Sequence, residues 1–449
     1  MPASQSTAFL TDMYELTMLD ATLRAGTADR RCVFELFGRR LPATRRFGVV
    51  AGTGRVLEAL ERFHFGPEQI DWLHRENIVS DQALDYLREF RFTGDIMGYA
   101  EGECYFEGSP IMTVESTFAE AVLLETLALS ILNHDCAVAS AASRMTIAAH
   151  GRPCLDMGAR RTHERAAVSA ARAAVIGGFE ATSDLEAGIR YGIKTIGTSA
   201  HSFTLLHDSE DDAFRIQIDA LGPSTTLLVD TYDIAEGVKR AVRIAKEAGG
   251  QLGAVRLDSG DLVAQAFRVR GQLDALGAHS TKITVTSDLD EYAIAALGAA
   301  PVDSYGVGTR LVTGSGVPTA ALVYKLVERE DEGGNPVDVA KKSASKSTVG
   351  GRKVAGRVRG EDGYASEELL VVDASDEDGL RALQEAGARP LQVPLVRGGQ
   401  IDTSHYGPHA LEMARERHRQ ARNELPYQAW RLSEGEAAIP TRYLRLPRD

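Results

Sequence analysis

The middle of the chain alternates between short apolar runs and longer segments of helical periodicity. Each run is rich in β-branched residues, ends in a polar cluster and precedes a segment whose apolar residues recur every three or four positions. Apolar runs placed between amphipathic helices are typical of strands buried on both faces of a parallel sheet. The pattern predicts six strand–helix units, with strands in the ranges 153–161, 194–201, 225–233, 253–261, 282–290 and 302–310.

A polar cluster at the carboxyl end of every strand favours a barrel over an open sheet. In an α/β barrel these ends meet on one face, where active sites are built. The expected fold class is therefore α/β, with an irregular TIM-like barrel over residues 131–330. A doubly wound open sheet remains the alternative.

The two ends of the chain differ from the middle. Residues 1–130 mix strand-like and helical runs, as an α+β domain does, and residues 331–449 form a polar C-terminal segment. Strands are expected at 31–42 and within 92–116, and helices at 11–19, 53–63, 80–90, 118–132 and 407–423. The chain after Leu326 is expected to form a hairpin or a loop.

Composition narrows the classes of partner. The chain has 449 residues, 44% of them hydrophobic and 25% charged, which suits a globular protein of two domains. Its net charge of −13 disfavours nonspecific binding to nucleic acid or to an anionic membrane.

The N-terminus shows no secretory signal, so a cytoplasmic location is expected. The four cysteines contain no CxxC pair, which predicts reduced, mostly buried thiols and no dedicated metal site.

The stretch VRLDSGD, residues 255–261, places a cation and a carboxylate at one strand end. Alternation along the strand sends Arg256 and Asp258 to the same side, so both face one cavity. Asp258 can accept from ribose hydroxyls while Arg256 faces negative charge, which suits a polyhydroxylated anion. An ion pair that closes the barrel is the structural alternative.

Two later strand ends are candidates for phosphate binding. In SYGVGTRL, residues 304–311, Gly306 and Gly308 let backbone amides approach an anion and Thr309 adds a hydroxyl, although a tight turn also uses glycine. One strand earlier, Ser287 and Asp288 are placed either to contact the same phosphate or the ribose, or to cap the following helix.

Two earlier strand ends present a histidine and a pair of arginines. His201, in IGTSAHSF, is either a satisfied core histidine or a reactive imidazole held at the end of a strand. In DMGARRTHE, Arg160 is favoured over Arg161 for bidentate binding of a substrate carboxylate, with a pair to Glu164 as the alternative. His163 is interpreted as structural.

The segment 341–359 is basic and contains no acidic residue. It either reaches over a polyphosphate or is the solvated face of a hairpin. Its weak candidates for phosphate binding are Lys341, Lys342, Ser343 and Lys346.

The ordered set of motifs resembles the nicotinate phosphoribosyltransferase family. In the family's order and spacing occur TDMYELTM at 11–18, FELFGRRLP at 34–42, GARRTHE at 158–164, GFEATSDLEAG at 178–188, GTSAHSF, VRLDSGD and SYGVGTRL. The resemblance implies a type II phosphoribosyltransferase, in which an N-terminal α/β sandwich domain, completed by the C-terminal chain, accompanies the barrel. It also implies a head-to-tail homodimer with shared active sites.

The reaction that the resemblance implies joins nicotinate to phosphoribosyl diphosphate and gives nicotinate mononucleotide and diphosphate in NAD salvage. ATP hydrolysis is coupled to turnover through phosphorylation of His201, and Mg²⁺ neutralises the leaving group without a dedicated protein cage. The implied ligands are therefore nicotinate, phosphoribosyl diphosphate and ATP.

The resemblance also assigns further residues. Nicotinate is bound by Arg160, by Ser183 and by Tyr14 of the partner subunit. Asp12 of the partner subunit binds the phosphoribosyl or phosphate groups, Arg256 lines the pyridine and phosphate site, and Asp258 holds the ribose. Phosphate oxygens are bound by Thr198, Ser199, Gly306, Gly308 and Thr309. Two departures from the family pattern are Met157, where relatives often have an aromatic ring, and SASKSTVGG, which lacks a Pro-Gly turn after the lysines.

Three other functions are weighed against this one. Relatives that use nicotinamide carry an aspartate in place of Ser183, although Asp184 is the next residue here. A sugar-phosphate lyase or aldolase would need a Schiff-base lysine at a strand end, whereas Lys194 and Lys282 begin their strands. A noncatalytic sensor of NAD metabolites would keep the pocket without turnover.

Overall fold

The computed structural model describes residues 6–341 and 348–447, and these form two compact units. We call the unit that combines Met1–Ser140 with Val317–Asp449 the outer unit, because the two ends of the sequence form it. Ala141–Gly316, the middle of the sequence, is called the central unit. The boundary at Ser140 falls inside α6 (Glu125–Ala148). The domain limits expected from the sequence, at residues 130 and 330, stay a prediction.

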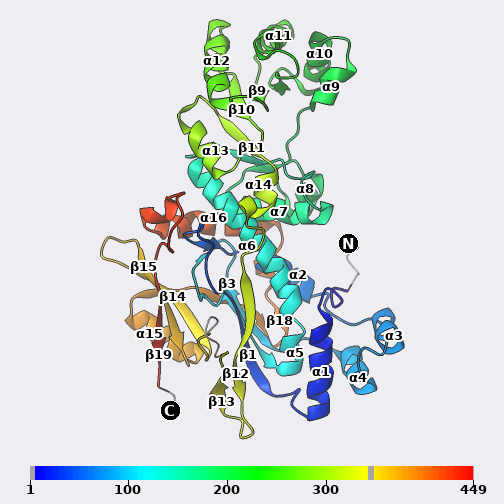
Figure 1. Ribbon diagram of the computed structural model, residues 1–449, viewed down its shortest axis with the longest axis vertical. Coiled ribbons are helices and arrows are strands. Elements are labelled where there is room, and N and C mark those ends of the chain that lie inside the picture. Colours follow the sequence, from blue (N-terminus) through cyan, green and yellow to red (C-terminus); the bar gives the residue numbers. More distant parts are fainter. Residues whose placement is uncertain (1–5, 342–347, 448–449) are drawn as a thin grey trace. The chain divides into compact units, whose positions relative to one another are not determined.

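A seven-stranded antiparallel sheet forms the centre of the outer unit (Figure 1). In the order β13-β12-β1-β5-β3-β17-β18 its strands are Pro336–Asp338, Leu322–Glu330, Arg31–Gly38, Met112–Thr117, Asp95–Tyr99, Gln392–Arg397 and Gln400–Ile401. Seven of the eight residues of β1 are buried, because this strand lies between β12 and β5. Strands from the C-terminal chain thus complete a sheet that the N-terminal chain begins.

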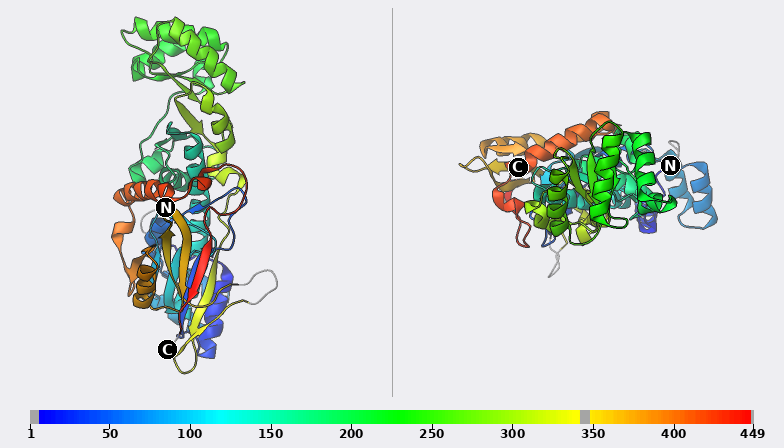
Figure 2. Two further views of the ribbon diagram at one scale, coloured as in Figure 1. Left: turned by 90° about the vertical axis from the view of Figure 1, so that its left-hand side faces the viewer. Right: turned by 90° about the horizontal axis from the view of Figure 1, so that it is seen from above.

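Helices and a smaller sheet complete the outer unit. The helices are α1 (Met13–Ala25), α2 (Thr53–Leu60), α3 (Pro67–Arg75), α4 (Asp81–Glu89), α5 (Phe118–Val122), α15 (Asp376–Glu385) and α16 (Pro408–Glu424). The four-stranded sheet has the order β16 (Ala388–Pro390), β14 (Lys353–Arg359), β15 (Ala365–Val372) and β19 (Thr441–Arg445). Figure 2 shows β19, in red, within this unit, where it pairs in parallel with β15. Two short strands, β2 (Gly48–Val49) and β4 (Cys104–Tyr105), pair separately.

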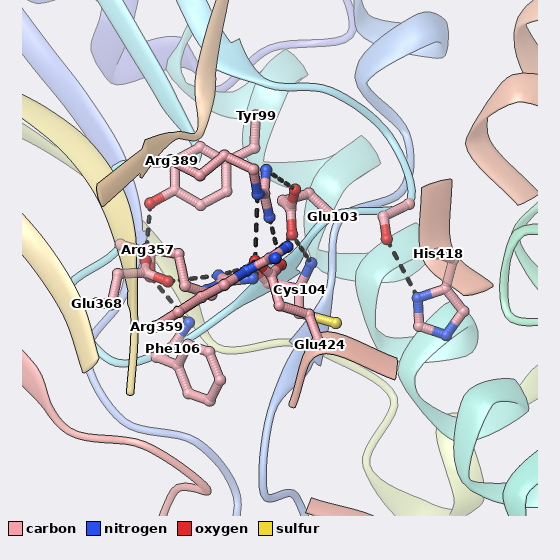
Figure 3. A network of polar contacts seen from close by, with 12 residues as sticks. Tyr99, Glu103, Cys104, Phe106, Arg357, Arg359, Glu368, Arg389, His418 and Glu424 are labelled. Carbon is pink, nitrogen blue, oxygen red and sulfur yellow. Dashed lines mark hydrogen bonds and ion pairs between the residues drawn. The ribbon is translucent and has the colours of Figure 1, made fainter. Parts of the chain in front are cut away.

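A network of buried charges joins the four-stranded sheet to the N-terminal segment (Figure 3). Arg357 on β14 is fully buried and donates to Glu103 at 2.8 Å and to Glu368 at 2.6 Å. Glu368 also accepts from the hydroxyl of Tyr99 at 2.7 Å, and Arg389 donates to Glu103 at 3.0 Å. Because each buried charge has an opposite charge in contact, the network holds chain segments that are distant in sequence.

The central unit contains a six-stranded parallel sheet with the order β7-β6-β11-β10-β9-β8. Its strands are β6 (Cys154–Asp156), β7 (Ala181–Thr182), β8 (Thr226–Leu228), β9 (Ala254–Leu257), β10 (Lys282–Val285) and β11 (Ser304–Val307). The helices that follow them are α7 (Glu164–Ile176), α8 (Leu185–Tyr191), α11 (Ile234–Glu247), α12 (Leu262–Ala275), α13 (Glu291–Ala296) and α14 (Thr309–Val312). Two more, α9 (His201–Leu206) and α10 (Glu210–Leu221), precede β8.

The strand order is that of a half-barrel and not of a closed barrel. The last strand, β11, pairs with the first, β6, as in a barrel, which excludes the doubly wound alternative for this sheet. In the described residues, however, β7 and β8 are the two edges and do not pair with each other. The expected irregular TIM-like barrel is therefore not confirmed, although the α/β class is.

One predicted strand is wrong, and so is one predicted helix. Residues 194–201 form no strand: Thr195 makes an isolated bridge to Thr182, and the strand of this region is β7. The segment has a single large apolar residue, Ile196, so it has little to bury on two faces. The helix expected over 118–132 is divided, because α5 ends at Val122 and α6 begins at Glu125.

The cysteines are buried and unpaired, as predicted. All four are buried free thiols, and burial raises the pKa of Cys32 to about 11. No helix in the described parts of the chain combines the length and the apolar character that crossing a bilayer requires.

Candidate functional site

A cavity of about 550 Å³ lies against the central sheet, where residues at the carboxyl ends of β6 and β7 and at the start of β8 line it. Six of the residues predicted from the sequence line it together: Met157, Arg160, Ser183, Thr198, Ser199 and Arg256. They come from β9 and from the segments that follow β6 and β7, so only the folded sheet brings them to one place. A cavity of this size that is lined largely by Ser, Thr and Arg side chains suits a small polar ligand.

Arg256 lies at the wall of this cavity with its cationic group only loosely held. Its Nη1 donates to Thr198 Oγ1 and to the carbonyl of Ser199, both at 3.3 Å, and Nη2 is 4.0 Å from Asp258 Oδ1. Arg256 and Asp258 therefore face the same side, as strand alternation predicts. Burial lowers the pKa of Arg256, and nearby Arg160 adds to this effect while Asp258 and Asp230 oppose it. At these distances the pair is too loose to be a closed ion pair, so the guanidinium can meet a ligand anion.

His201 is not a core residue. It is the first residue of α9, its side chain is 41% exposed, and its Nδ1 is 3.1 Å from Thr231 Oγ1. Its Nε2 is 3.9 Å from Asp230 Oδ1. The core-histidine alternative is wrong, because the imidazole is both accessible and beside a carboxylate.

Asp230 is a site residue that the sequence analysis missed. Its side chain is 1% exposed, and Oδ2 accepts from the amide of Asp258 at 2.9 Å and from Ser259 Oγ at 2.8 Å. Within the described chain, the buried Oδ1 has no hydrogen-bond partner. The carboxylate thus links the end of β8 to the end of β9 and faces His201. Its place after the apolar run of β8 was the available signal.

The residues after β10 lie at the exposed edge. Ser287 and Asp288 are exposed, and Ser287 has a positive φ of 132°. The cap of α13 is Asp290, whose side chain accepts from the amides of Tyr292 and Ala293. The capping alternative is therefore wrong for Ser287 and Asp288, while their contact with phosphate or ribose stays a prediction.

Gly306 and Gly308 lie at the end of β11. A Cβ on Gly306 would come within 2.6 Å of Met157 Sδ and 2.5 Å of Thr286 Cγ2, so glycine is needed there for close packing. Gly308 precedes α14, which begins at the exposed Thr309. Phosphate binding by this turn stays a prediction.

Ser183 faces the cavity and its neighbour Asp184 does not. Asp184 is buried as the N-cap of α8, where its Oδ1 accepts from the amide of Ala187 at 2.9 Å. Ser183 is fixed by its own amide, which donates to the carbonyl of Asp156 at 2.8 Å. The position that the sequence analysis associated with the choice between acid and amide thus carries a hydroxyl.

The loop after β6 presents Arg160 at the cavity. Arg160 is exposed and lines the cavity, which Arg161 does not. His163 is structural, as predicted, because its Nδ1 accepts from the amide of Arg165 at 3.2 Å and caps α7.

The remaining predicted residues belong to the outer unit. Tyr14 and Asp12 lie at the start of α1, where Asp12 accepts from Thr126 Oγ1 at 3.3 Å. Burial, together with the carboxylates of Glu125 and Glu15, raises the pKa of Tyr14 to about 12. Lys341 is exposed, whereas Lys342, Ser343 and Lys346 lie outside the described residues.

Three acidic residues that are close enough to share a metal ion occur in the outer unit, among the residues described. They are Glu328, Asp338 and Asp373, and Arg445 is in contact with two of them. The guanidinium supplies the positive charge there, so the cluster is best interpreted as an ion-pair network.

The sequence of the chain is similar to the sequences of known proteins. Residues 9–133 match the model of the nicotinate phosphoribosyltransferase N-terminal domain. A nicotinate phosphoribosyltransferase of Mycobacterium tuberculosis is 53% identical, over 98% of this chain and 96% of the relative. That of Bacillus subtilis is 38% identical, over 80% of this chain and 74% of the relative.

A similar fold is found among solved structures. The structure of human nicotinic acid phosphoribosyltransferase superposes with a TM-score of 0.80 at 24% identity, over 97% of each chain. At 53% identity across nearly the whole length, the chain and its relative from M. tuberculosis share one fold. The chain therefore belongs to the nicotinate phosphoribosyltransferase family.

Proposed function

We propose that this enzyme transfers the 5-phosphoribosyl group of phosphoribosyl diphosphate to nicotinate in NAD biosynthesis, releasing nicotinate mononucleotide and diphosphate. The observation that best supports the proposal is one cavity lined by Arg160, Ser183 and Arg256. Two cations and a hydroxyl around a small cavity suit an aromatic acid that reacts with a phosphorylated sugar. The names of the relatives with high identity agree with it.

Nicotinate fits the charge of the cavity better than nicotinamide does. Arg160 offers a bidentate partner to the carboxylate, and Ser183 offers a hydroxyl that repels neither form. The nearest carboxylate in sequence, Asp184, is occupied as the cap of α8. The carboxylate of nicotinate is therefore not repelled by a negative charge from this segment.

The chemical step places the ring nitrogen against the anomeric carbon. A carbon–nitrogen bond forms there as the bond to the diphosphate oxygen breaks, through an oxocarbenium-like state. Asp258 accepts from the ribose hydroxyls, and Arg256 faces the negative charge of the phosphates. Thr286 donates to Asp258 and holds its carboxylate in place.

His201 is proposed as the phosphoacceptor that couples ATP to turnover. The neutral imidazole attacks the γ-phosphorus, ADP leaves, and the phosphoryl group stays on the ring until water removes it as phosphate. Asp230 lies beside the imidazole and balances the positive charge that develops on it, while Thr231 orients Nδ1. Thr198 and Ser199, three and two residues earlier, can donate to the phosphoryl oxygens.

Magnesium and ATP are proposed as the cofactors. Mg²⁺ retains several waters and is usually held by one or two carboxylates together with substrate phosphates. The carboxylates of Asp258 and Asp288 at this edge fit that role, and Mg²⁺ there would neutralise the diphosphate.

The active assembly is proposed to be a homodimer in which Asp12 and Tyr14 complete the partner's site. Tyr14 is 43% exposed, and Leu10 and Met13 beside it are 49% and 57% exposed. An exposed apolar group of this kind suits a protein partner, and a second copy would cover it. The tyrosine ring would then stack on the pyridine.

The test is incubation with γ-labelled ATP. The intact enzyme should take up an acid-labile, base-stable phosphoryl group, and His201→Ala should lose it. Retention of the label in His201→Ala would exclude the phosphohistidine. In parallel, turnover of nicotinate should exceed that of nicotinamide, and the opposite preference would exclude the proposed substrate.

A further inference from the structure

A buried carboxyl group that the proposed reaction does not use lies next to the residues assigned to nicotinate. Asp156 is the last residue of β6 and is 1% exposed. Leu155 and Met157, on either side of it, line the cavity. Since side chains alternate along a strand, Asp156 points away from the cavity and can act on a ligand only through its neighbours.

Two donors from different segments hold this carboxylate. Oδ1 accepts from the amide of Gly158 at 2.8 Å, and Oδ2 accepts from the hydroxyl of Thr182 at 2.6 Å. Thr182 Oγ1 in turn accepts from the amide of Asp184 at 3.0 Å. One side chain thus ties the loop after β6 to the end of β7, which carries Ser183.

The loop after β6 has no room to move at Gly158. A Cβ on this residue would lie 2.2 Å from Val312 Cγ1 and 3.0 Å from Asp156 Oδ1. Gly158 is therefore confined between α14 and the carboxylate. Arg160 follows two residues later, so the place of Gly158 sets the place from which Arg160 extends.

A carboxylate in this position is costly to keep. Burial raises the pKa of Asp156 to about 6, and the charge of Asp184 adds to it, while the hydrogen bonds from Thr182 and Gly158 oppose both. An apolar residue would avoid the cost, but it would leave a buried amide and a buried hydroxyl without their acceptor. The chain thus retains a carboxylate whose burial is unfavourable at the point where two segments of the nicotinate site meet.

We propose that Asp156 is a positioning residue for nicotinate, which fixes Arg160 relative to Ser183 by bridging Gly158 and Thr182. The inference rests on the proposed function, because that function assigns nicotinate to these two side chains. Asp156 acts on the binding of the pyridine substrate and leaves the binding of phosphoribosyl diphosphate unchanged, since neither of its two hydrogen-bond donors, Gly158 and Thr182, is among the residues assigned to phosphate.

Steady-state kinetics with each substrate varied in turn test this assignment. Asp156→Ala should raise the KM for nicotinate about tenfold, because a small misplacement of binding groups is costly. The KM for phosphoribosyl diphosphate should stay within about twofold of the wild-type value. Asp156→Asn should recover part of the loss, since its carbonyl oxygen still accepts from one donor. Thr182→Val, which removes one of the two bonds, should raise the KM for nicotinate about threefold.

Glu210→Gln is the matched control. Glu210 is a 2% exposed carboxylate of the same unit and is paired with Arg240 at 2.9 Å. The Glu210→Gln variant should change neither KM value. An equal rise in both KM values, a fall in kcat alone or no change in Asp156→Ala would overturn the assignment. If that variant does not fold, Thr182→Val decides by the same criterion. A wild-type enzyme that does not use nicotinate would instead refute the proposed function, and the inference with it, before any variant is measured.

Discussion

Replacement of Arg357 by methionine tests how the outer unit is held together. Arg357 and Glu368 are each 0% exposed, and their closest atoms are 2.6 Å apart (Figure 3). Methionine keeps most of the volume of the arginine stem and removes the charge. Glu103 keeps Arg389 as a cation at 3.0 Å, whereas Glu368 keeps the hydroxyls of Tyr99 and Ser109, which carry no charge.

One buried carboxylate therefore loses its opposite charge, which costs about 3–5 kcal/mol of unfolding free energy. Equilibrium unfolding in denaturant should show this as a lower midpoint with an unchanged slope. The double variant Arg357→Met with Glu368→Gln should regain a large part of the loss, since no unpaired charge remains.

The control is Arg442→Met on β19, whose side chain is 48% exposed and pairs with Glu367 at 2.7 Å. It should cost less than about 1 kcal/mol, because water screens an exposed pair. If Arg357→Met costs no more than this control, or if the two changes at Arg357 and Glu368 simply add, the buried network is not what stabilises this unit.

Three further predictions concern the cavity and the response to acid. Gly306→Ala should raise the KM for nicotinate and cost about 1–3 kcal/mol of stability, because its Cβ would displace Met157; normal kinetics would show that the close packing is unimportant. Ser183→Asp should lower kcat/KM for nicotinate at least about tenfold and favour nicotinamide, because it brings a negative charge to the cavity; an unchanged preference would remove Ser183 from substrate choice. Burial and the charge of Arg422 lower the pKa of His418 to about 4, so the folded protein keeps this imidazole neutral while the unfolded chain takes up a proton near pH 6.5. Stability should therefore fall as the pH drops from about 6.5 to 4, by about 3 kcal/mol from this group, and His418→Gln should flatten that part of the unfolding profile; an unchanged slope would exclude the histidine as its cause.

Local pattern was sufficient for most of the central sheet. The predicted runs around β6, β8, β9, β10 and β11 each contain the observed strand, because an apolar run with β-branched residues and a polar end is a local property. The alternation of side chains along a strand is also a local property, and it correctly predicted that Arg256 and Asp258 lie on one side of β9. Capping was harder, since several polar residues before a helix compete, and Asp290 caps α13 while Ser287 and Asp288 do not.

The pairing of segments that are distant in the sequence could not be predicted from local pattern. Residues 194–201 look like the other strand ends, but whether they join a sheet depends on edges that β7 and β8 provide from elsewhere in the chain. β7 itself is two residues long, which is too short for any periodicity to show. Asp230 and Asp156 gain their roles from partners that are 26–29 residues away in sequence.

The sequence by itself determined the α/β class, the polar carboxyl edge of the strands and the family motifs, because each of these depends on residues that are close together in the sequence. Only the tertiary structure decided that the sheet is a half-barrel, that Ser183 faces the cavity while Asp184 caps a helix, and that one buried carboxylate lies beside His201 while another bridges Gly158 and Thr182. The physical reason is that hydrogen bonds and burial depend on distances in space, which the order of residues along the chain does not give.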